Sequence, residues 1–234
     1  MGATYTFGNS TSNLATASAQ TKYNNTNLAA PAFAVRIKGD AWTNLSSYQD
    51  RCLLRFPSRN NFQLRASQGD PGVYSVVFYD SNNGASYLTL TFTPSASAFY
   101  VMYAQYEIGG GGCYVVIADA SGTVLDTSSS FYSAALGGST GEIEFGPFDV
   151  AKGYTLDGAA IYTAPKSGAA RFAVPTSGDS NIVGLYKFDE GSGTSVADAT
   201  GGTSLTIAGS GTWNTNDGAW DGSTSLFRPY FITG

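Results

Sequence analysis

The stretch AFYVMYAQYEIGGGGCYVVIADASGTVL, residues 98–125, decides the fold. Its first limb places Tyr100, Met102 and Tyr106 on one face, with the period of two that marks a β-strand. Four glycines at 109–112 allow the backbone to reverse, and the continuous apolar run 113–118 is typical of a strand covered on both faces. A tight turn then leads into a third strand. The stretch predicts the centre of an antiparallel sheet.

Short apolar segments with turn residues between them continue along the rest of the chain. They predict further strands at 4–7, 33–38, 51–56, 62–66, 73–79, 87–93, 142–148, 154–162 and 171–174. We expect the strand at 33–38 to be half-buried, with Arg36 and Lys38 outward, the polar residues 8–30 to lie along the surface, and 127–140 to form a loop. No segment holds a helical period for three turns. The fold class predicted is all-β, an antiparallel jelly-roll β-sandwich.

The composition excludes several classes of protein. Only 12% of the 234 residues are charged, about half the usual share, so the polar surface must consist of Ser, Thr, Asn, Gly and Tyr. There is no histidine, which removes Ser-His and Cys-His nucleophile pairs and the commonest zinc ligand. A net charge of −5 argues against nucleic acid as a partner. No apolar run is long enough to span a membrane.

The charges are separated along the chain. Six basic residues lie between Arg36 and Arg65, whereas residues 66–151 carry eight acidic residues and no Lys or Arg. One interpretation is ordinary charged strand surfaces. The other is that basic and acidic faces meet between copies of the chain in an assembly.

Cys52 and Cys113 are the only cysteines. Each stands beside strand-like apolar residues, which favours two buried reduced thiols over a disulfide. Two cysteines without histidine make no zinc site. The opening MGATYTFGNSTSN has neither a basic start nor an apolar core, so we expect a protein made without a signal peptide.

Several stretches resemble the laminin-G-like branch of the concanavalin A-like lectin/glucanase superfamily. In the body these are PAFAVRIKGDAW (31–42), FQLRAS (62–67), VYSVVFYD (73–80), YLTLTFTPSASAFYVMYAQYE (87–107), CYVVIADASGTVLDTSSS (113–130) and GYTLDGAAIYTAP (153–165). The more specific match is in the tail, where GLYKFDEGSGTSVAD (184–198), residues 205–213 and WDGSTS (220–225) resemble the opening hairpin of such domains. The resemblance implies a lectin-like sandwich.

The order of these motifs differs from that of the family, because the opening hairpin comes about 150 residues after the strand that it normally precedes. Three arrangements fit: a circularly permuted sandwich, a complete domain followed by a truncated one, or a tail donated to a neighbouring copy. About 50 residues cannot bury a sandwich core alone. We therefore expect a domain at 1–180 and a C-terminal strand tail at 181–234, which docks on the same sandwich or on a neighbouring copy.

Aromatic rings that stack on a sugar, beside Asn and Asp that bind its hydroxyls, are the candidate binding residues. The candidates are Trp42, Tyr79, Asp80, Asn82, Tyr87, Tyr103 and Tyr106. The alternative for each ring is a place in the core or on a sheet surface. No cofactor is predicted. Asp80, Asn82 and Asn83 form an oxygen-rich loop that suits calcium, although the same residues also make an ordinary turn.

The sequence gives little indication of a catalytic site, and no catalytic residue is predicted. Glu142 and Glu144 share a strand face and resemble the start of the acidic strand motif of glucanases in the superfamily, but Pro147 stands where the third acid is needed. Asp157 matches an Asp of the family's last-strand motif, which more often fixes a loop than binds ligand. We expect Asp189 and Glu190 to anchor the tail's opening turn through backbone N–H groups.

The favoured function is a non-enzymatic structural and adhesion protein on the surface of a particle, such as a phage virion or an extracellular particle. Its expected partners are copies of itself, other particle proteins and surface glycans, with no nucleic acid. A soluble carbohydrate-binding lectin module is the first alternative. A glycoside hydrolase that uses Glu142 and Glu144 is the second.

Overall fold

The structure, a computed structural model, describes residues 3–23, 28, 30–57, 62–80, 84–106, 112–131, 141–148 and 152–215, and the statements below concern these residues. Nearly all regular structure in them is β-strand. The exceptions are a single helical turn, α1 (Asp40–Thr43), and two 3₁₀ turns, η1 (Thr21–Tyr23) and η2 (Gly168–Arg171).

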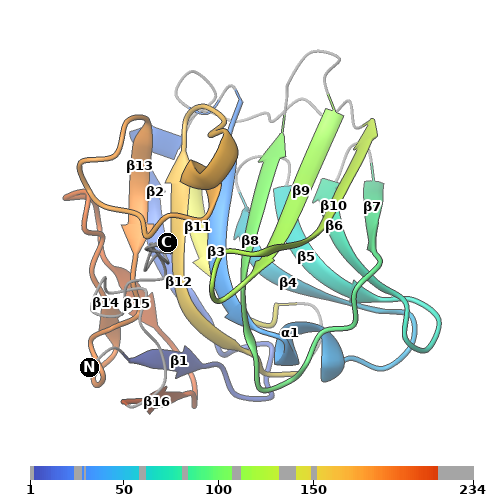
Figure 1. Cartoon of the computed structure of the whole chain (residues 1–234). Coiled ribbons are helices and arrows are strands. Elements are labelled where there is room, and N and C mark those ends of the chain that lie inside the picture. The colour runs from blue at the N-terminus through green and yellow to red at the C-terminus, as the bar shows by residue number, and fades with distance from the viewer. Residues whose placement is uncertain are drawn as a thin grey trace, which may run out of the picture.

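Two eight-stranded antiparallel sheets face each other, as Figure 1 shows. The first, called sheet A, runs in the order β10 (Val124–Phe131), β9 (Gly112–Asp119), β8 (Phe99–Tyr106), β3 (Ala32–Lys38), β12 (Thr155–Tyr162), β1 (Thr4–Thr6) and β16 (Thr212–Asn214), with β13 (Ile182–Tyr186) also paired to β12. The second, sheet B, runs β14 (Ser195–Val196), β15 (Leu205–Ile207), β2 (Ala15–Gln20), β11 (Gly141–Phe145), β4 (Gln49–Phe56), β5 (Phe62–Gln68), β6 (Tyr74–Asp80) and β7 (Gly84–Leu90). The predicted all-β antiparallel sandwich is confirmed.

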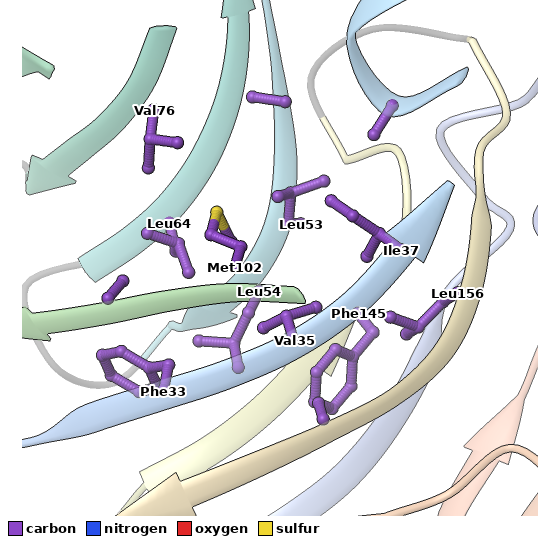
Figure 2. Close-up of a cluster of buried hydrophobic side chains, with 14 of the residues drawn as sticks. Phe33, Val35, Ile37, Leu53, Leu54, Leu64, Val76, Met102, Phe145 and Leu156 are labelled. Carbon is purple, nitrogen blue, oxygen red and sulfur yellow. The ribbon is translucent and has the colours of Figure 1, made fainter. Parts of the chain in front are cut away.

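The main core fills the space between the sheets. Figure 2 shows Phe33, Val35 and Ile37 of β3 pointing toward Leu54 and Leu64 of sheet B. These side chains alternate with outward ones along each strand, because successive residues of a strand point to opposite faces. Burial of this apolar surface is the main free-energy term that holds the two sheets together.

The outer face of sheet A is covered as well. The segment 163–181, which contains η2, places Phe172 over a second apolar cluster made by Val101, Val116, Ala118 and other side chains of that face. The prediction that the apolar run 113–118 is covered on both faces is therefore confirmed, since Val116 and Ala118 lie under this segment while Val115 and Ile117 enter the main core.

The structure corrects the prediction that the strand at 33–38 is half-buried. That strand is buried on both faces, and Arg36 is 6% exposed. Its guanidinium forms an ion pair with Asp157 and lies 4.4 Å from the ring centroid of Phe99. Asp157 thus fixes an interior arginine, and the charge of Arg36 is compensated inside the molecule.

Four other sequence predictions were wrong. The predicted loop 127–140 begins too early, because residues 127–131 belong to β10 and pair with β9. The opening stretch 98–125 lies at one end of sheet A, because β10 is its edge strand. Within the polar stretch 8–30, Ala15–Gln20 forms β2 in the middle of sheet B. Residues 171–174 end a 3₁₀ turn and form no strand, and Phe172 packs on sheet A.

The described part of the tail, 181–215, contributes strands to both sheets of its own chain. β13 pairs with β12, β15 with β2, and β16 with β1. Side chains reinforce this docking: Lys22 forms an ion pair with the buried Asp198, and the Tyr23 and Tyr186 hydroxyls lie 2.9 Å apart. At the tail's first turn, Glu190 accepts a hydrogen bond from the Ala197 N–H at 2.8 Å, as predicted, and both Asp189 and Glu190 are exposed.

Cys52 and Cys113 are both buried thiols that form no disulfide, which agrees with the prediction of two reduced thiols. A search of the described residues finds no helix with the length and apolar character needed to cross a membrane.

Candidate functional site

A polar hollow of about 440 Å³ lies on the outer face of sheet B, and we call it the Tyr48–Tyr87 hollow. Its lining comes from the turn before β4 and from strands β4, β5 and β7: Tyr48, Gln49, Asp50, Arg65, Ser67, Gln68, Gly69 and Tyr87. This face differs from the outer face of sheet A, where the segment 163–181 covers an apolar cluster.

The strand register brings the lining residues together from three strands. Asp50 of β4 stands opposite Ser67 of β5, and Arg65 of β5 is linked through Val77 of β6 to Tyr87 of β7. Neighbours such as Leu64, Ala66 and Leu88 point into the core, so the alternation of each strand directs Arg65, Ser67 and Tyr87 outward. Residues more than 35 positions apart thus share one patch.

Tyr87 lies on the last strand of sheet B and has 53% of its surface exposed. Its hydroxyl donates a hydrogen bond to Asp50 Oδ2 at 3.2 Å. Partial burial, together with the negative charge of Asp50, raises the pKa of Tyr87. The hydroxyl therefore keeps its proton at neutral pH, and the exposed ring remains available for contact.

Tyr48 is the residue that sequence reasoning missed. It is 78% exposed and has a φ of 61°, in the left-handed region that tyrosine rarely adopts. Its N–H donates to the Gly69 carbonyl at 3.0 Å, and its hydroxyl donates to Asp70. The hydrogen bond to Asp70 raises the pKa of Tyr48. The sequence signal was a lone large aromatic in the polar loop TNLSSYQD.

Arg65 supplies the positive charge among the lining residues. Its Nη1 lies 3.5 Å from Asp50 Oδ2, and its Nε donates to Gln63 Oε1 at 2.8 Å. The guanidinium also lies 4.3 Å from the ring centroid of Tyr79. Tyr79, a predicted ligand contact, therefore supports Arg65 from β6 and is not among the lining residues of the hollow.

Three other predicted binding residues are interior. Trp42 is fully buried, and its Nε1 donates to the Ser75 carbonyl at 3.0 Å. Tyr106 lies in the main core, and Tyr103 lies beneath the covering segment, where its hydroxyl accepts a hydrogen bond from the Lys166 N–H at 2.5 Å. A ring without exposed surface cannot stack on a sugar, so these three residues leave the candidate set.

The predicted calcium loop cannot be placed. Asp80 ends β6, and its side chain, Asn82 and Asn83 lie outside the described residues. Within the described residues, no group of three or more His, Cys, Asp or Glu is arranged to hold a metal ion.

Glu142 and Glu144 lie on the same outer face, beside a second hollow of about 370 Å³ lined largely by Ser and Thr. Glu142 is exposed, whereas Glu144 forms an ion pair with Arg55, its neighbour on β4. The Arg55 guanidinium lies 3.0 Å from the ring centroid of Phe148. One of the two carboxylates is therefore already held by an arginine.

Comparison with known proteins shows the fold. No family model matches the sequence, and no curated protein matches it either. A heptameric SAP-like pentraxin from Limulus polyphemus superimposes with a TM-score of 0.56 and 12% identity, covering 88% of this chain and 95% of that one. Together with the two sheets, this likeness confirms the predicted concanavalin A-like sandwich fold.

Two other solved structures are similar at lower scores. Domains LG4-5 of the mouse laminin alpha1 chain match with a TM-score of 0.43 and 12% identity, over 70% of this chain and 42% of that one. Tailspike protein 2 of Escherichia coli O157:H7 bacteriophage CAB120 matches with a TM-score of 0.40 and 10% identity, over 59% of this chain and 20% of that one. This chain thus aligns with less than half the length of each.

Proposed function

We propose that the chain is a non-enzymatic adhesion module that binds carbohydrate through the Tyr48–Tyr87 hollow. The observation that carries the proposal is the pair of exposed tyrosine rings that line one polar hollow. An aromatic ring presents a flat apolar surface to the C–H face of a pyranose, while carboxylate, amide and hydroxyl groups bind sugar hydroxyls. Asp50, Ser67 and Gln68 offer those groups in the same hollow.

Substitution of the two rings tests the proposal. Tyr48→Ala and Tyr87→Ala should each weaken glycan binding about tenfold, which corresponds to about 1.4 kcal/mol of lost stacking. Both rings are exposed, so the melting temperature should change little. The measurement is a glycan array with the wild-type protein, followed by titration of the best ligand against each variant. Val124→Ala is the matched control, because Val124 is 50% exposed on β10 of sheet A.

Blank arrays, or a bound glycan that neither tyrosine substitution weakens, would refute binding at this hollow. The non-enzymatic part of the proposal has its own test. The wild-type protein should release no reducing ends from the glycans that it binds. Hydrolysis that disappears in Glu142→Gln or Glu144→Gln would instead establish a glycoside hydrolase.

We place the module on the surface of a particle, such as a phage virion. The support is the composition: 12% charged residues, 29 glycines and a surface rich in Ser, Thr and Asn suit a protein packed among neighbours. Detection of the chain in purified particles, with an antibody that reaches it on intact particles, is the expected result. A protein recovered only in the free fraction would favour the soluble lectin module.

A further inference from the structure

We propose that the Tyr48–Tyr87 hollow selects neutral carbohydrate and rejects acidic carbohydrate. The reason is that Asp50 already forms an ion pair with the guanidinium of Arg65, which an acidic sugar would need as its own partner. This inference rests on the proposed function, since it assigns the class of sugar to the same site.

The charges that line the hollow are balanced. Among the described residues that line it, Arg65 and Asp50 are the only Lys, Arg, Asp or Glu, and their Nη1 and Oδ2 atoms lie 3.5 Å apart. Arg65 is engaged on its other sides by Gln63 and by the ring of Tyr79. A sugar carboxylate prefers a bidentate contact with an arginine, so it would have to displace Asp50 from Arg65.

The surroundings of the hollow add negative charge. Asp70 lies at the rim, where it accepts a hydrogen bond from the Tyr48 hydroxyl. Arg55, the other arginine on this face of β4 and β5, is paired with Glu144. An anionic ligand would therefore approach two carboxylates, Asp50 and Asp70, while the charge of Arg65 is already balanced by Asp50.

A neutral sugar need not displace Asp50 from Arg65, and the carboxylates of Asp50 and Asp70 do not repel it. Its hydroxyls can donate to the Asp50 carboxylate and can both donate to and accept from the amides of Gln49 and Gln68. Its C–H faces can pack on the exposed rings of Tyr48 and Tyr87 without any change in the balance of charge.

Matched glycan pairs test the inference. The array carries lactose beside sialyllactose, and methyl-esterified oligogalacturonide beside the free acid, together with neutral hexose and xylose oligomers. The wild-type protein should bind neutral members and should not bind their acidic partners. Asp50→Asn releases Arg65 while keeping an acceptor for the Tyr87 hydroxyl, so its affinity for acidic members should rise about tenfold or more.

Two variants separate a local effect from a change in net charge. Asp189→Asn removes one negative charge from an exposed position in the tail, and its affinity for acidic glycans should not rise. The double variant Asp50→Asn with Arg65→Gln should lose the increased affinity for acidic glycans, because it has no guanidinium at position 65.

The outcomes separate the two proposals. A wild-type protein that binds no glycan overturns both. A wild-type protein that binds through Tyr48 and Tyr87, yet binds acidic and neutral partners equally, overturns only the selectivity. So does a folded Asp50→Asn variant without a gain for acidic members. Should Asp50→Asn fail to fold, the matched pairs on the wild-type protein still decide the question.

Discussion

At the scale of single residues, Tyr48 shows a conflict between local backbone preference and observed structure, since its φ is 61°. A left-handed backbone costs a non-glycine residue about 1–2 kcal/mol. Its side chain gains little from burial in return, because it is 78% exposed. The conformation is held by the backbone contact with Gly69 and the side-chain contact with Asp70. Strain at an exposed residue is typical of functional positions, and here it fixes the direction of the ring.

Replacement of Tyr48 by two small residues measures this strain. Tyr48→Gly and Tyr48→Val both lose the ring and the hydrogen bond to Asp70, but only glycine adopts the left-handed region without cost. We expect the valine variant to have a free energy of unfolding about 1–2 kcal/mol below that of the glycine variant. Urea unfolding of the pair gives the difference. Equal stabilities would mean that the backbone at position 48 carries no strain.

The binding residues were only partly predictable from the sequence. Tyr87 was predicted as an aromatic ring able to stack on a sugar, and it lies in the hollow. Tyr48 was missed because it stands in a loop, where no periodicity shows the direction of a side chain. Trp42, Tyr103 and Tyr106 were predicted but are buried. Trp42 and Tyr106 enter the main core between the sheets, and Tyr103 lies under the covering segment, whose position the pattern of one strand does not reveal.

At the scale of elements, strands with strong apolar alternation were predicted best. β9 (Gly112–Asp119) lies within one residue of the predicted limits 113–118 at each end. β2 was missed because its sequence, ATASAQ, consists of small and polar residues that are depleted in strands, and its place in sheet B is set by pairing with β11 and β15. The predicted strand at 171–174 had only a short apolar run. In the structure, Phe172 of that run packs on sheet A and holds the segment 163–181 against it.

The docking of β13 depends on a glycine. A Cβ on Gly184 would overlap the Tyr23 hydroxyl and would lie 3.3 Å from Ile161 Cδ1. Gly184→Ala should therefore lower the free energy of unfolding by about 1–3 kcal/mol, as other overpacking substitutions do. Adding Tyr23→Phe removes the overlapping hydroxyl and should restore part of the loss.

Thermal and urea unfolding of these variants provide the measurement. Gly178→Ala is the control, since a Cβ there meets nothing closer than 4.0 Å, and it should change stability by less than about 0.5 kcal/mol. A Gly184→Ala variant as stable as this control would show that β13 does not press against Tyr23.

At the scale of the whole molecule, the tail completes both layers of the sandwich. Its strands pair with β12, β2 and β1, and its side chains Leu185, Tyr186, Phe188, Val196, Leu205 and Ile207 are buried. The sequence predicted that the tail must dock, because so few residues cannot bury a core of their own. It could not predict that β15 pairs with β2, because β2 was itself unrecognised.

Deletion of residues 181–234 should make the protein aggregate. The deletion uncovers the edges of β12, β2 and β1 and leaves apolar faces without partners, and unpaired edges recruit other chains. Size-exclusion chromatography of the truncated protein, with a dye that binds exposed apolar surface, is the measurement. A truncated protein that stays monomeric and melts at the wild-type temperature would contradict the prediction.

The pairing of β1 with β16 brings Thr4 and Asn214 side by side at one edge of sheet A, whereas β7, which carries Tyr87, closes sheet B beside β10 at the opposite edge. In Figure 1 the two edges stand at opposite sides of the molecule. A tether attached at the edge that contains Thr4 and Asn214 would leave Tyr87 on the side of the molecule away from the attachment point. A scaffold that binds this edge would therefore leave the opposite edge exposed to solvent and to ligands.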